Sequence, residues 1–135
     1  MDRKVTHSLL VALAEASDAS VRNAIALQVA DERIVGGDEV LSQLIQRPEL
    51  ANQRGTLVHA LSHFDCSGHV MLLVDLVVSG NFEVAHEALQ ALETIEHLEG
   101  DDVLRAFERL ERVRGQADLE AWRMNLLDDL TEMFE

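Results

Sequence analysis

A seven-residue segment recurs three times along this chain, and its spacing constrains the fold more than any other feature of the sequence. The copies begin 32 and 31 residues apart and cover residues 21–27, 53–59 and 84–90. Behind each copy, a second apolar pattern begins 17 to 19 residues later, at Val40, Val70 and Val103. A fixed period of this length is typical of stacked helical hairpins. The sequence therefore predicts a fold built from repeated helix pairs.

The composition favours helix over strand throughout. Hydrophobic residues make up 47% of the 135 residues, proline occurs once and tyrosine is absent. Apolar residues recur at spacings of three and four, which is the period of an amphipathic helix. This length and apolar content suit one continuous core. We therefore predict a single all-α domain over residues 1–135.

Glycines and capping residues divide the chain into eight predicted helices. Their expected ranges are residues 3–16, 19–31, 38–47, 49–64, 68–79, 82–98, 102–114 and 118–134. Six side chains could cap a helix start: Asp18, Asp38, Ser67, Asn81, Asp101 and Asp118. We expect the central six helices to form three antiparallel pairs in sequence order. The first and last helices, the latter with Trp122, would cover the ends of the stack.

The charge balance limits the classes of partner. The chain has 25 acidic and 11 basic residues, a formal net charge of −14. Binding to nucleic acid requires clustered cations, and an anionic membrane would repel this chain. The same charge would attract a cationic protein over a long range. We expect a basic protein partner, no nucleic acid and no membrane.

The single cysteine, Cys66, cannot form a disulfide within the chain. Cytoplasm is therefore the expected location. The apolar run at residues 9–14 is short for a secretion signal, and the apolar runs are too short to span a membrane. We predict a soluble monomer.

The repeats resemble a known family. Val21, Arg22 and Ala24, the return of Arg54 and the hairpin period resemble HEAT-like repeats of the armadillo-type α-solenoid class over residues 17–114. The third copy departs from the pattern, with Ala85 at the arginine position. The resemblance implies a short right-handed α-solenoid of about three hairpins plus capping helices. The class includes adaptors, inhibitors, chromophore lyase subunits, DNA glycosylases and a di-iron hydroxylase, so fold alone does not select a function.

Two histidine patterns are candidates for metal chemistry. His86-Glu87 resembles the metal-binding dyad of deoxyhypusine hydroxylase, but the other two copies have Asn-Ala and Gly-Thr at the equivalent positions, which cannot complete the ligand set. A second pattern has nitrogen and sulfur ligands of the kind that zinc takes: His59, His63, Cys66 and His69. Cys66 could also act as a nucleophile if His63 or His69 activated it, although no glycine-rich loop accompanies them. We expect no catalytic residues, no metal and no cofactor, with both patterns being ordinary helix and turn residues.

Acidic and polar residues form the predicted partner-binding surface. By resemblance, the second helix of each pair lines the concave side of the solenoid, which implicates Asp38, Glu39, Gln43, Asp75, Asp101 and Asp102. Acidic residues also concentrate in residues 81–99, with five and no lysine or arginine, and in residues 118–135, with six against Arg123. From these segments we add Glu83, Glu87, Asp128 and Asp129 to the predicted surface.

These features favour a non-enzymatic protein-binding module. Its most concrete form is an immunity or inhibitor protein that covers the active site of a cationic toxin such as a nuclease, because acidic side chains can replace substrate phosphates. Two alternatives stay open. One is a general adaptor that uses the same surface, and the other is a metal-dependent HEAT-repeat enzyme that uses His86-Glu87 or the four-residue histidine and cysteine cluster.

Overall fold

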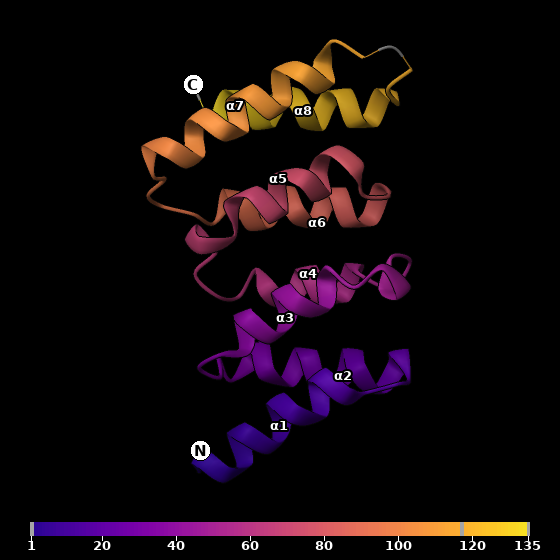
Figure 1. The fold of residues 1–135 in the computed structure, drawn as a ribbon, viewed down its shortest axis with the longest axis vertical. Helices are drawn as coiled ribbons and strands as arrows, with labels where there is room; N and C mark the ends of the chain where they lie inside the picture. Colours follow the sequence, from indigo (N-terminus) through magenta and orange to yellow (C-terminus); the bar gives the residue numbers. More distant parts are fainter. Residues whose placement is uncertain (1, 117, 135) are drawn as a thin grey trace. The chain divides into compact units, whose positions relative to one another are not determined.

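Residues 2–116 and 118–134 are described in a computed structural model, and every regular element in these ranges is helical (Figure 1). The predicted all-α class is confirmed. The α-helices are α1 (Arg3–Glu15), α2 (Ala19–Asp31), α3 (Gly37–Ile45), α4 (Gly55–Leu61), α5 (Val70–Ser79), α6 (Phe82–Glu93), α7 (Gly100–Arg114) and α8 (Ala121–Phe134). Two short 3-10 helices, η1 (Pro48–Leu50) and η2 (Ser67–His69), precede α4 and α5. None of the helices in the described ranges has the length and hydropathy needed to cross a membrane.

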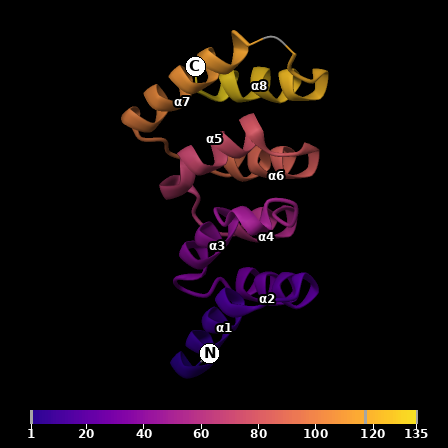
Figure 2. The same ribbon diagram turned by 45° about the vertical axis from the view of Figure 1, so that its right-hand side comes forward.

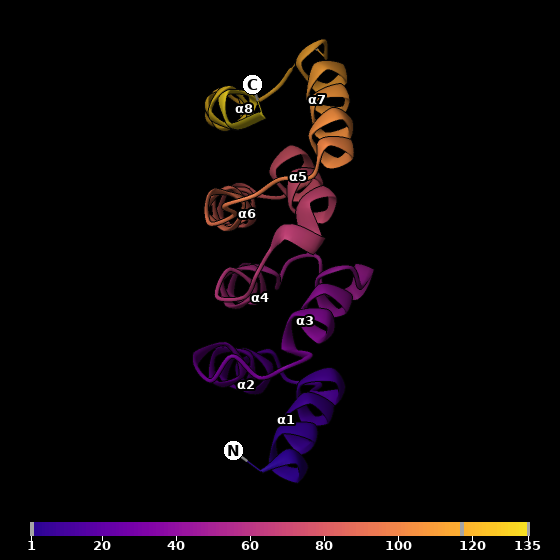
Figure 3. The ribbon, with the colours of Figure 1, turned by 90° about the vertical axis from the view of Figure 1, so that its left-hand side faces the viewer.

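The chain divides into two compact units, residues 1–64 and residues 65–135. In the first unit, α1 and α3 lie on one side and α2 and α4 on the other, as Figures 2 and 3 show. Helix α1 packs against α2 and α3 against α4, and α2 and α4 also pack together. The core between these helices contains fully buried leucines at Leu13, Leu41, Leu57 and Leu61. Leu57 and Leu61 are four residues apart, so both lie on the same buried face of α4.

The second unit has the same alternation, with α5 and α7 on one side and α6 and α8 on the other (Figure 3). Helix α5 packs against α6 and α7 against α8, while α5 contacts α7 and α6 contacts α8. Leu73, Leu92, Leu110 and Leu127 are fully buried between them. Each such leucine contributes roughly 2 kcal/mol of burial energy before conformational entropy is subtracted. Each unit is therefore two helical hairpins that share a core.

The order of pairing differs from the prediction. Segment 19–31 was expected to pair with 38–47, whereas α2 packs mainly on α1 and α4. Similarly, α6 packs on α5 and α8 and not mainly on α7. The terminal helices α1 and α8 are members of hairpins and not separate covers. The repeat period fixes the length of a hairpin but not the helix with which it starts. The three copies of the recurring segment fall at the second helix of the first three pairs, α2, α4 and α6.

Three of the predicted helices have bounds that differ by more than two residues from those in the structure. Residues 49–64 do not form one helix: they contain most of η1, a turn and the short α4, which begins at Gly55 and ends at Leu61. Helix α6 ends at Glu93 instead of residue 98, where the hydroxyl of Thr94 donates to the carbonyl of Ala91 at 2.6 Å. Helix α8 begins at Ala121 instead of residue 118.

Two of the six predicted caps are confirmed. Asp18 accepts a hydrogen bond from the Val21 amide at 3.0 Å, and Asn81 accepts one from the Val84 amide at 2.9 Å. Each bond satisfies a donor that would otherwise lack a partner at a helix start.

The other four residues do not occupy the N-cap position of a helix. Asp38 and Asp101 lie inside the first turns of α3 and α7, after Gly36 and Glu99. Ser67 is the first residue of η2, and its amide donates to Asp65 at 3.0 Å. Asp118 has a left-handed backbone with φ of 71° and precedes the start of α8.

Candidate functional site

The predicted dyad His86-Glu87 lies on α6, where His86 takes part in aromatic packing. Its Nδ1–H donates to the carbonyl oxygen of Phe82 at 2.7 Å, and its ring centroid lies 4.1 Å from that of Phe82. Among the described residues of the second unit, no third histidine, cysteine or carboxylate lies close enough to complete a metal site with this pair. His86 is therefore a half-buried residue that packs against an aromatic neighbour on its own helix.

The histidine and cysteine pattern is divided between the two units. His59 and His63 belong to the first unit, where their rings meet edge to face at 5.2 Å and His63 Nδ1–H donates to the His59 carbonyl at 3.1 Å. Cys66 and His69 belong to the second unit, where both are buried and the His69 amide donates to the Cys66 carbonyl at 2.9 Å. The contacts in the first unit thus position His59 and His63, and those in the second unit position Cys66 and His69.

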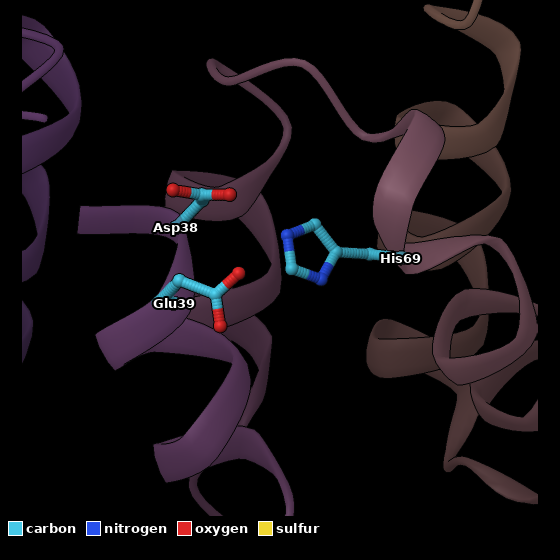
Figure 4. A group of neighbouring side chains, drawn as sticks. All are labelled: Asp38, Glu39 and His69. Carbon is cyan, nitrogen blue, oxygen red and sulfur yellow. The ribbon is translucent and has the colours of Figure 1, made fainter. Parts of the chain in front are cut away.

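Three predicted binding residues lie on α3 in the first unit. Figure 4 shows the carboxylates of Asp38 and Glu39 in the first turn of this helix. Asp38 is half-buried, while Glu39 and Gln43 are exposed and one helical turn apart. Carboxylates in a first turn also stabilise a helix through its dipole. His69, drawn in the same figure, is a residue of the second unit and ends η2.

Two predicted binding residues form ion pairs inside the second unit. Asp75 on α5 lies 3.2 Å from Nε of Arg109, and Asp128 on α8 lies 2.9 Å from Nη2 of Arg114. Both arginines lie on α7, so each carboxylate partner comes from another helix. The carboxylates of both pairs remain about half exposed, so they keep contact with solvent.

The other predicted residues of the second unit lie at its surface. Glu83, Asp101 and Asp129 are exposed, and Glu87 and Asp102 are half-buried. Glu83 lies in the first turn of α6, while Asp101 lies in the first turn of α7. These five predicted residues are therefore accessible at the surface of this unit.

The second unit contains an open acidic hollow, whose lining residues were not predicted from the sequence to lie together. Its volume is about 500 Å³. Its lining combines three carboxylates with an imidazole and small polar residues, namely Asp65, Ser67, Gly68, Thr94, Ile95, Glu96, His97 and Glu99. The Ser67 amide, which donates to the carboxylate of Asp65, lowers the pKa of that group from its ordinary value. The hollow therefore keeps negative charge well below neutral pH.

Local structure explains why the hollow forms. Helix α6 ends at Glu93, so Glu96 and Glu99 lie in the segment that leads to α7 and not on a helix face. Asp65 faces the same hollow from the segment before η2. The run of acidic residues without a cation in residues 81–99 indicated Glu96 and Glu99, whereas no sequence signal linked Asp65 to them.

Charge is distributed very unequally between the units. Residues 65–135 carry seventeen acidic residues against five arginines, while residues 1–64 carry eight acidic and six basic residues. In addition, Arg109, Arg114 and Arg123 each bond to a carboxylate of the second unit. The second unit therefore produces most of the negative field of the chain.

Comparison of the chain with protein-family models, curated proteins and solved structures found no match.

Proposed function

We propose that this chain is a non-enzymatic protein-binding module that captures a basic protein through its acidic second unit. In this proposal the hairpins belong to a short right-handed α-solenoid of the HEAT-like class, which presents surfaces for partners. The observation that carries the proposal is the acidic hollow of the second unit, in a unit with seventeen acidic residues and five arginines. A cationic partner would be attracted to this unit before contact and held by the carboxylates after contact.

The chemistry of the hollow suits a cationic side chain. Asp65, Glu96 and Glu99 surround a space of about 500 Å³, which has room for a guanidinium or ammonium group. Carboxylates accept two parallel hydrogen bonds from arginine, so a partner arginine could bind there with defined geometry. His97 lines the same hollow and adds a polar contact.

The concrete form that we favour is an immunity or inhibitor protein for a cationic toxin such as a nuclease. The active site of a nuclease binds phosphates through cations. A surface that places several carboxylates against those cations would occupy the position of the substrate backbone. Inhibition would then combine electrostatic competition with steric exclusion of the substrate.

A comparison of two triple variants tests this proposal on the partner recovered from native lysate. The hollow variant is Asp65→Asn with Glu96→Gln and Glu99→Gln. The control variant is Glu15→Gln with Glu32→Gln and Glu49→Gln, which removes the same charge from exposed positions of the first unit. We expect the hollow variant to bind the partner at least about tenfold more weakly than the control. Equal affinities of the two variants would reject the hollow as the binding site.

The inhibitor form has its own test, because an adaptor would bind without blocking activity. The activity of the recovered partner on its substrate is measured with one equivalent of this chain present. Loss of activity that returns with the hollow variant supports an inhibitor. Full activity in a complete complex contradicts it.

A further inference from the structure

The second unit exposes an aromatic cluster formed by Phe82 and His86 of α6 and Trp122 of α8. The ring centroids of Phe82 and His86 lie 4.1 Å apart, and Trp122 lies 5.2 Å from Phe82 and 5.9 Å from His86. Phe82 is 57% exposed, while His86 and Trp122 are half-buried. We call these three residues the aromatic patch. It lies at the surface of the unit and is not part of the core.

The patch is unusual for this composition. The chain has four phenylalanines and one tryptophan, and two of these five residues meet here. Exposed aromatic side chains that pack against one another lose little entropy on binding and supply a large contact area. Such residues are over-represented among those that dominate the energy of protein interfaces.

The charges beside the patch select its partner. Glu83 and Glu87 lie on α6 next to Phe82 and His86, and their spacing of four residues places them on one side of the helix. The ring of Trp122 already holds a cation on one face, since the guanidinium carbon of Arg123 lies 4.4 Å from its centroid. Aromatic faces and carboxylates together match an arginine side chain, which stacks on rings and bonds to carboxylates at the same time.

We infer that the aromatic patch is the anchoring contact for an arginine-bearing segment of the basic partner, with Glu83 and Glu87 pairing its charge. This inference rests on the proposed function and names a second contact region, formed by α6 and α8. A second copy of the chain is a poorer occupant, because its second unit has the same excess of acidic residues and would be repelled.

Trp122 makes the test direct, because it is the only tryptophan of the chain and lies in the patch. The probe is a short fluorescein-labelled peptide of alternating arginine and serine, titrated at low salt. Anisotropy of the label reports binding anywhere on the chain. A separate titration with unlabelled peptide uses the emission of Trp122 to report binding at the patch. We expect the emission of Trp122 to change in the same range of peptide concentration in which anisotropy rises, and a lysine-serine peptide to bind several-fold more weakly.

Matched variants separate the patch from general charge attraction. Phe82→Ala should weaken binding of the arginine peptide about fivefold. Leu104→Ala removes a side chain that is 59% exposed on α7 and should leave binding unchanged. Far-UV circular dichroism of both variants establishes that the helices are retained.

Three outcomes would overturn the inference. Binding seen by anisotropy without any response of Trp122, or with equal affinity in Phe82→Ala and the original chain, overturns the patch while leaving the proposed function in place. No binding of the peptide at all counts against both. Self-association that is abolished by Phe82→Ala would instead assign the patch to a second copy of the chain.

Discussion

Nη1 of Arg123 on α8 lies 2.8 Å from the carbonyl oxygen of Val77 on α5. The same guanidinium donates to the carbonyls of Val78 and Gly80, both at 2.8 Å, and to both carboxylate oxygens of Glu120 at 3.0 Å. The last carbonyls of a helix have no partner within the helix and carry partial negative charge. One buried arginine therefore caps the end of α5 and joins it to α8.

Replacing Arg123 should destabilise the second unit strongly. Arg123→Ala leaves several carbonyls at the end of α5 without donors, and we expect a loss of about 3 kcal/mol in the free energy of unfolding. Arg123→Lys keeps the charge but not the planar set of donors, so it should restore only part of this loss. Urea denaturation followed by far-UV circular dichroism measures both variants. An unfolding midpoint unchanged in Arg123→Ala would contradict the capping role.

The bond from Arg123 also predicts a pH dependence. It lowers the pKa of Glu120 from 4.5 to about 2. The folded state thus favours the charged carboxylate, and the stability from this pair is fully present above the unfolded pKa of 4.5. It should be lost as pH falls from about 4.5 to about 2. The measurement is the difference in urea midpoint between the original chain and Glu120→Gln. This difference should shrink as pH falls through that window, and a difference that stays constant would contradict the assigned pair.

At Gly37 in the first unit, a side chain would collide with neighbouring side chains. A Cβ there would lie 2.6 Å from Cγ1 of Val29 and 2.8 Å from Cζ of Phe64. Gly37→Ala should therefore cost roughly 1 to 3 kcal/mol, because the core must shift to accept it. Gly100→Ala is the control, since nothing lies within 4 Å of its Cβ position and alanine favours helix. Thermal unfolding measures both variants. The Tm of Gly37→Ala should be lower than that of the original chain, and the Tm of Gly100→Ala should be equal or higher.

The core of the first unit gives a further stability prediction. Leu61 is fully buried on α4, and Leu61→Ala should cost about 3 kcal/mol through lost burial and the cavity left behind. Leu27 on α2 is 41% exposed, so Leu27→Ala should cost under about 1 kcal/mol. Urea denaturation of the two variants tests whether burial, and not leucine content, decides the effect.

The helices could be predicted because their signals are local. The caps Asp18 and Asn81 and the apolar period indicated helix starts that the structure contains. The pairing of the helices was predicted wrongly, because a repeat period gives the length of a hairpin and does not show which helix is the first of each pair. The bond between Arg123 and Val77 joins residues 46 positions apart, and no spacing rule in the sequence indicates such a contact.

The same distinction applies to the candidate site. The excess of acidic residues in the second unit could be counted in the sequence, and exposed residues such as Glu83 were identified from it. The hollow could not be predicted, because it depends on α6 ending at Glu93 and on Asp65 facing the segment that follows. The pairing of Asp75 with Arg109 was also missed, because it joins two helices.

The rate of association with the recovered partner, measured by stopped flow at increasing salt, tests the central claim most directly. Capture by long-range attraction to the acidic second unit predicts a rate that falls at least about tenfold between about 0.02 M and about 0.5 M salt. Over the same range the dissociation rate should change much less. An association rate that does not depend on salt would contradict the account.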